Sequence, residues 1–75
     1  MWEKLKKLKI FDIEDLPYGT RIQLVYIIDG ITNMQLATVF NTKIGLQNGK
    51  IITKRELRSW MNDNSCSVYE VEENA

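Results

Sequence analysis

The sequence contains no histidine and only one cysteine, Cys66, among its 75 residues. These absences exclude an intramolecular disulfide. They also exclude serine–histidine and cysteine–histidine mechanisms, which need an imidazole base. A structural zinc site needs about four Cys, His or carboxylate ligands, so we expect neither a metal nor another cofactor. A lone cysteine fits a reducing compartment best, and we expect a cytoplasmic protein.

Long apolar runs are also missing. No stretch approaches the roughly 20 apolar residues of a membrane span, and the N-terminal segment alternates lysine with leucine where a signal peptide would be continuously apolar. We therefore expect a soluble protein with no membrane partner. Net charge is absent as well, because ten basic residues balance ten acidic ones, so a histone-like protein is not supported.

The short length limits what the core can hold. A single domain of this size buries only roughly 60% of the surface that its unfolded chain exposes. We therefore expect no room for a deep pocket of roughly 300 Å³ or more, and hence no small-molecule substrate. Asp12, Glu14 and Asp15 could supply paired carboxylates, but this polar approach to a proline turn at Pro17 offers little burial. The sequence thus predicts that the protein is not an enzyme.

What the chain does contain begins with a helical pattern at the N-terminus. Trp2, Leu5 and Leu8 fall three residues apart with lysines between them, which predicts a short amphipathic helix over residues 2–9. Such a basic helix could lie on a membrane or on nucleic acid. Because the apolar stripe is short and the sheet needs a cover, the other use is favoured, a helix that packs this stripe onto the sheet.

A strand-like alternation covers residues 21–28, and Asp29-Gly30 follows it, a dipeptide typical of two-residue hairpin turns. That turn would place Tyr26 opposite Asn33, so an apolar face would meet polar residues. A loop one residue longer places Tyr26 opposite Met34 and restores a continuous apolar face. We therefore predict an odd loop of three or five residues, with a bulge.

The next elements follow from clear turn and cap signals. A second strand is predicted over residues 33–40, and two short strands pair across Asn48-Gly49, a dipeptide suited to a type I′ turn. Thr53 and Glu56 have the spacing of a capping box, which predicts a helix over residues 54–61.

Together these elements predict a small α+β domain that spans residues 1–75. It has the N-terminal helix, a curved antiparallel sheet of four or five strands that is SH3-like or a partly open barrel, and one helix before the last strand. Residues 16–71 form the sheet and helix core, with residues 67–71 as the last strand. Residues 72–75 form a frayed acidic tail.

Basic side chains from the second hairpin and the helix are the best candidates for a site. They could gather on one side of the domain and neutralise several phosphates. Base stacking is not expected, because Tyr26, Phe40 and Trp60 are better used in the core. The plainer alternative is that each cation is solvated. The candidate nucleic-acid-binding residues are Lys43, Lys50, Lys54, Arg55 and Arg58.

Three segments also resemble a known family. They are Leu16-Pro17-Tyr18-Gly19-Thr20-Arg21-Ile22, Ala37-Thr38-Val39, and residues 45–53 followed by a helix. In this order they resemble the restriction-enzyme and adenine-methylase associated domain over most of the chain. The resemblance implies a small αβ domain associated with DNA modification or defence that reads DNA. The chain departs from the family where Lys54-Arg55-Glu56 replaces small residues and where Cys66-Ser67-Val68-Tyr69 replaces a tryptophan-rich segment.

We therefore expect a small non-enzymatic binding module that is associated with DNA through a basic hairpin and helix face, in a restriction, modification or bacterial defence context. The alternative is a protein-binding module, such as a small phage-type inhibitor or adaptor of a host protein. That module would use the same face or an exposed edge strand. The sequence leaves the oligomeric state open.

Overall fold

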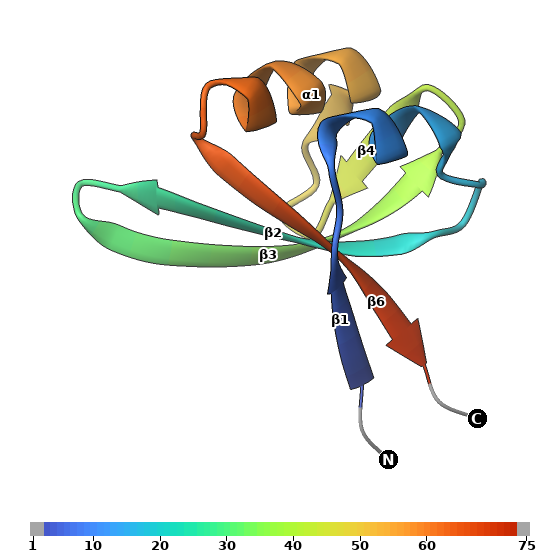
Figure 1. Ribbon diagram of the computed structural model, residues 1–75, viewed down its shortest axis with the longest axis horizontal. Helices are drawn as coiled ribbons and strands as arrows, with labels where there is room; N and C mark the ends of the chain where they lie inside the picture. Colours follow the sequence, from blue (N-terminus) through green and yellow to red (C-terminus); the bar gives the residue numbers. More distant parts are fainter. Residues whose placement is uncertain (1–2, 74–75) are drawn as a thin grey trace.

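The computed structural model describes residues 3–73, which form one open antiparallel sheet, one α-helix and one 3₁₀ helix (Figure 1). The strand order is β1-β6-β2-β3-β4-β5. In chain order the elements are β1 (Glu3–Lys7), η1 (Ile10–Asp15), β2 (Arg21–Ile28), β3 (Ile31–Phe40), β4 (Lys43–Leu46), β5 (Ile51–Thr53), α1 (Lys54–Asn62) and β6 (Cys66–Glu73). The predicted fold is therefore wrong in two respects, because these residues form six strands in an open sheet and begin with a strand instead of a helix.

The prediction of an N-terminal helix is wrong because these residues pair with a strand at the other end of the chain. β1 pairs antiparallel with β6, and Lys6 lies opposite Glu70. A helix of one or two turns is unstable by itself, whereas a strand beside β6 gains ladder hydrogen bonds and a pair of opposite charges. The predicted tail is corrected in the same way, because residues 72 and 73 belong to β6. Residue 2 of the predicted helix and residues 74–75 of the tail lie outside the described residues.

The β2–β3 hairpin closes on the two-residue turn that the sequence pattern argued against. Ile28 lies opposite Ile31 and Tyr26 lies opposite Asn33, so the longer bulged loop is wrong. Asp29 and Gly30 both have positive φ, 52° and 78°, as a type I′ turn requires.

The β4–β5 hairpin has the predicted strands but a different turn. Gly49 N donates to Leu46 O over 3.0 Å, and Leu46 N donates to Lys50 O over 2.8 Å. Gly49 has a φ of 92°, whereas Asn48 is not among the residues with positive φ. The loop is therefore a three-residue loop with a bulge at Gly49, not a type I′ turn.

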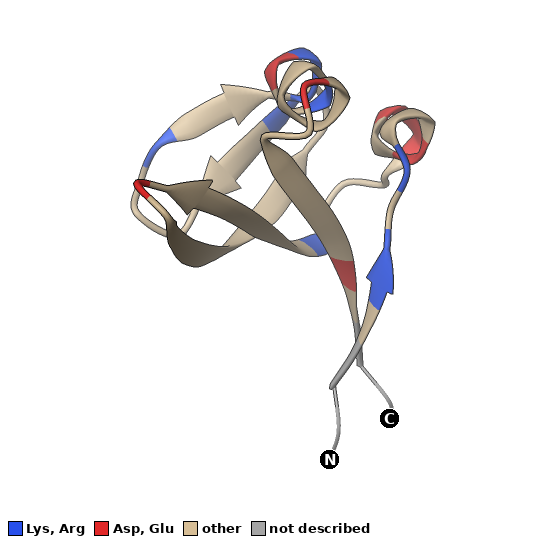
Figure 2. Ribbon diagram, turned by 60° about the vertical axis from the view of Figure 1, so that its left-hand side comes forward, with Lys and Arg blue, Asp and Glu red and all other residues tan. Residues whose placement is uncertain are grey.

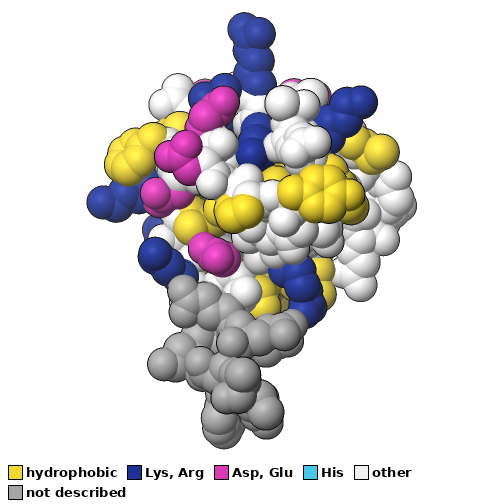
Figure 3. All heavy atoms as spheres, turned by 90° about the vertical axis from the view of Figure 1, so that its right-hand side faces the viewer, with side chains coloured by type: hydrophobic (Ala, Val, Ile, Leu, Met, Phe, Trp, Pro, Cys, Tyr) yellow, Lys and Arg dark blue, Asp and Glu magenta, His cyan; other side chains and the backbone are white. Residues whose placement is uncertain are grey.

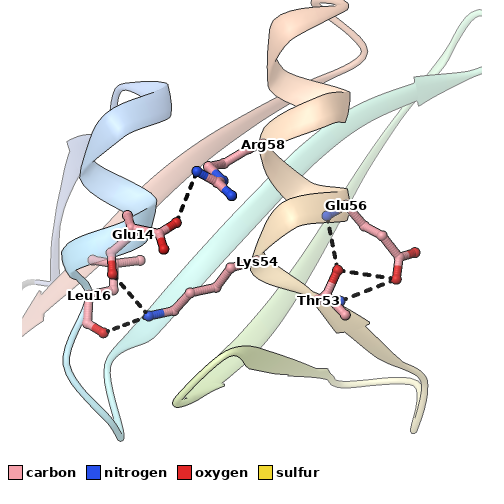
Figure 4. A network of polar contacts seen from close by, with 6 residues as sticks. All are labelled: Glu14, Leu16, Thr53, Lys54, Glu56 and Arg58. Carbon is pink, nitrogen blue, oxygen red and sulfur yellow. Dashed lines mark hydrogen bonds and ion pairs between the residues drawn. The ribbon is translucent and has the colours of Figure 1, made fainter.

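The helix prediction is confirmed at its start. Glu56 N donates to Thr53 Oγ1 over 3.0 Å, and Thr53 N donates to Glu56 Oε1 over 3.4 Å (Figure 4). This capping box fixes the first turn of α1 directly after β5. From there Leu57 and Met61 reach the core, whereas Trp60, which we expected to pack there too, is 38% exposed.

The core lies between α1 and η1 and one face of the sheet (Figure 1). Alternate residues of each strand point into it, and those between them point to the opposite side. We call this opposite side the outer face. The most deeply buried side chains are Ile13, Ile22, Leu24, Val39, Ile44, Leu57 and Val68.

Candidate functional site

Basic residues occur on several elements of the fold (Figure 2), and the side-chain contacts of the five predicted ones show that they do not share one face. Lys54 is buried, and its Nζ donates to Leu16 O over 3.0 Å and to Glu14 O over 3.4 Å (Figure 4). These carbonyls belong to the end of η1 and the residue after it. Lys54 therefore fastens η1 to α1 and is not available to a phosphate.

The other four cations point in different directions. Arg58 Nη1 lies 2.9 Å from Glu14 Oε2, so Arg58 also faces η1. Strand alternation places Lys43 on the outer face, whereas Lys50 lines a cleft on the helix side. Arg55 is exposed on α1. Basic side chains are separated by acidic and apolar ones in the view of Figure 3.

The outer face carries a row of exposed apolar side chains. Ile27, Met34 and Leu36 lie on it by alternation, and Phe40 and Ile51 extend the row across β3 and β5. Isolated apolar residues at a surface are ordinary, but a contiguous apolar patch marks an interaction site. This face was missed because the sequence interpretation turned Met34 and Leu36 into the core.

Between Leu5 and Val71, the strand residues that alternation places on the outer face carry charges of one sign. Lys7, Arg21 and Lys43 lie on it by alternation. Among strand residues from Leu5 to Val71, the acidic side chain is Glu70, which alternation places on the other side. Over these residues the outer face is therefore apolar with a basic character, and at the ends of β1 and β6 the register continues on the same side to Glu3 and Glu73.

Two aromatic rings lie exposed on this face. Tyr18 and Phe40 meet edge to face with ring centroids 5.6 Å apart, and Phe40 is 43% exposed instead of buried as expected. The Phe40 ring packs over Gly45, where an added Cβ would lie 2.8 Å from Phe40 Cε2. Lys43 lies opposite Phe40 on the neighbouring strand. An aromatic pair thus stands beside a cation.

The β2–β3 hairpin projects beyond its neighbours in the sheet (Figure 1). β6 pairs with β2 only over residues 22–26, and β4 pairs with β3 only over residues 37–40. Beyond these ladders, Ile27, Ile31 and Met34 are each about two-thirds exposed. Exposed apolar side chains on a projecting hairpin contribute little to the stability of the domain, so their presence favours a role in binding.

A cleft of about 450 Å³ lies on the helix side, between the hairpin, the end of α1 and the β4–β5 loop. The pocket that we did not expect from the sequence is a deep one within the core, whereas this cleft lies between elements at the surface. Its walls are mainly apolar, and its polar residues are Gln35, Asn48, Lys50 and Ser65. Cleft-lining residues also include Leu24, Tyr26, Ile27, Ile28, Leu46, Ile52, Trp60 and Cys66.

Hydrogen bonds fix one wall of the cleft. Asn48 N donates to Gln35 Oε1 over 3.1 Å, and Gln35 Nε2 donates to the Tyr26 hydroxyl over 3.0 Å. Lys50 N donates to Asn48 Oδ1 over 3.0 Å. Gln35, which lies opposite Leu24 on the helix side of the sheet, therefore joins the β4–β5 loop to the hairpin.

Cys66 shows no sign of reactivity. Burial raises the pKa of the Cys66 thiol, and a backbone hydrogen bond with Val25 opposes that rise only in part. The thiol is therefore neutral near pH 7, where a nucleophile would need to be a thiolate. It is a free, buried cysteine that packs in the core.

Within residues 3–73, no helix has the length and apolar character to cross a membrane, and no three Cys, Asp or Glu side chains group as metal ligands. No family model, curated protein or solved structure matches this chain. The resemblance to the restriction-enzyme and adenine-methylase associated domain therefore stays a prediction.

Proposed function

We propose that this protein is a small, non-enzymatic binding module of the cytoplasm that docks on a partner protein through its outer face. The observation that carries the proposal is the exposure of Ile27, Met34, Leu36 and Phe40 on one side of the sheet. Protein interfaces have an apolar centre with a polar rim, and this face offers such a centre on the projecting hairpin.

The charges of the outer face indicate the kind of partner. Lys43 lies beside Phe40 and Lys7 lies on the same side of the sheet at β1, so an acidic partner surface complements this face. A second copy of this chain is a poorer partner, because face-to-face packing would bring cations of both copies together. The proposed partner is therefore an acidic protein with an apolar patch.

Site-specific crosslinking tests this function. A photoreactive benzoylphenylalanine replaces Met34 on the outer face, and the matched control replaces Arg55, which is exposed on α1. In cells we expect position 34 to capture one acidic protein that position 55 does not capture. Crosslinks from position 55 alone would contradict the proposed surface.

DNA binding is a second candidate, in the modification or defence setting that the resemblance implies. The exposed pair Tyr18 and Phe40 beside Lys43 favours it, because stacked bases and a nearby cation are the usual means of holding single strands. We expect Phe40→Ala and Lys43→Ala to weaken binding of a single-stranded oligonucleotide, and Arg55→Ala to have less effect. A lack of binding even at low salt would eliminate this candidate.

A further inference from the structure

We propose that the cleft between α1 and the β2–β3 hairpin binds a small apolar acid, such as an arylalkyl carboxylate. Its apolar body would pack against Tyr26 and Trp60, and its carboxylate would meet Lys50. The site is separate from the outer face, because these residues lie on the opposite side of the sheet. The inference therefore does not rest on the protein-binding function proposed above.

The walls of the cleft suit an apolar body. Trp60 is 38% exposed although its helix neighbours Leu57 and Met61 reach the core, so its indole remains available at the cleft. Small-molecule sites are concave, mainly apolar and roughly 300–1,000 Å³ in volume, and this cleft of about 450 Å³ falls within that range. The polar groups at its edge then decide which ligand is preferred.

The hydrogen-bond chain fixes the Tyr26 oxygen as an acceptor from Gln35. The backbone N–H of Asn48 can only donate, so it requires the oxygen of the Gln35 amide, and the amide NH₂ must face Tyr26. The Tyr26 oxygen accepts that bond. Its own hydrogen is then left to donate to a ligand in the cleft.

The charges that line the cleft point the same way. Lys50 is the charged residue among its lining residues, and no carboxylate lines it. An ammonium and a phenolic O–H are both donors, so they select an acceptor with negative charge. A carboxylate on an apolar body satisfies the donors and the walls together.

To test the proposal, the ¹⁵N-labelled full chain is titrated with 3-phenylpropionate and with its uncharged counterpart 3-phenylpropanamide. Binding is monitored by NMR. The acid should give saturable shifts of the Trp60 indole N–H and of the Gln35 and Asn48 side-chain amides. We expect the amide to bind about fivefold more weakly, since a partly exposed ion pair contributes at most about that factor. Lys50→Gln should reduce this difference between the two compounds.

Matched variants separate the cleft from the outer face. Lys43→Gln changes the same residue type in the same hairpin on the other side of the sheet, and it should leave the affinity for the acid unchanged. Tyr26→Phe keeps the ring and removes the donor, so it should weaken the acid more than the amide. Tyr26→Phe removes one hydroxyl and Lys43→Gln lies at an exposed position, and the amide spectra of both variants report whether the fold is retained.

Three results would overturn the proposal. The first is equal binding of the acid and the amide to the unmodified protein. The second is shifts confined to Met34, Leu36 and Phe40, which would place the acid on the outer face. In the third result, the acid causes no saturable shifts whereas the blocked peptide acetyl-Asp-Phe-amide does. That result would make the cleft a peptide site.

Discussion

The buried lysine on α1 gives the sharpest prediction for stability. Lys54→Met keeps most of the apolar length of the side chain and removes the ammonium, so it leaves Leu16 O without its 3.0 Å donor. A hydrogen bond to a charged group contributes about 1.5–3 kcal/mol, and the second bond, at 3.4 Å to Glu14 O, is too long to add much. We therefore expect a loss of about 2 kcal/mol in the free energy of unfolding.

This loss is measured by urea unfolding followed by circular dichroism. For a domain of this size it corresponds to a fall in Tm of about 10 °C. Arg55→Met is the matched control, because Arg55 is exposed on the same helix and should change stability by less than about 0.5 kcal/mol. Arg58→Met removes an ion pair whose side chains are 37% and 61% exposed, and it should cost no more than about 1 kcal/mol.

The reasoning is refuted if Lys54→Met and Arg55→Met unfold at the same urea concentration. It is also refuted if Lys54→Met keeps its stability but weakens binding to DNA. That result would mean that the Lys54 ammonium leaves the two carbonyls and binds phosphate, the role that the sequence predicted for Lys54.

Three further predictions concern the turns and the core. Gly30→Ala should cost about 1 kcal/mol, because Gly30 has a φ of 78° in the tight turn, and an unchanged urea midpoint would show that the turn is not type I′. Gly45→Ala should be destabilising because its Cβ meets the Phe40 ring. In a double-mutant cycle, Phe40→Leu should relieve part of that loss of stability, and strictly additive effects of the two substitutions would contradict the contact. Burial raises the pKa of the Cys66 thiol above its ordinary 9.0, so above that pH the folded protein binds more protons than the unfolded chain and stability falls as pH rises. Cys66→Ala should make this alkaline decline shallower, and identical declines would count against it.

Local signals in the sequence were reliable where neighbouring residues decide the structure. The Thr53 cap, the helix after it and the short strands around Asn48-Gly49 all depend on contacts within a few residues. The N-terminal strand could not be found in this way, because its ladder partner is β6 at the opposite end of the chain. A spacing of three between Leu5 and Leu8 fits a helix as long as no partner strand is known.

The β2–β3 hairpin shows a different reason for error. Asp29-Gly30 indicated the correct turn, but the argument for a continuous apolar face overruled it. A continuous apolar face is required only if every apolar residue of a strand belongs in the core. A conflict between a clear turn signal and the apolar pattern is expected where apolar residues are left at the surface, as Met34 and Leu36 are here.

The basic site was predicted from closeness in sequence, which does not fix direction. Lys54 and Arg58 stand one helical turn apart and both face η1, an element that the sequence did not reveal as a helix. Lys43 and Lys50 come from one hairpin but lie on different sides of it. The cleft depends on Gln35 and Trp60, whose roles appear only when the hairpin and α1 are placed together.

The most direct measurement of the central claim is the affinity of the partner captured at position 34, determined with purified proteins by calorimetry. Met34→Asp places a charge in the apolar centre of the outer face, and we expect it to weaken binding at least about thirtyfold, as for a residue at the centre of an interface. Arg55→Asp should bind as the unmodified protein does. Equal affinity for Met34→Asp and the unmodified protein would contradict docking through the outer face.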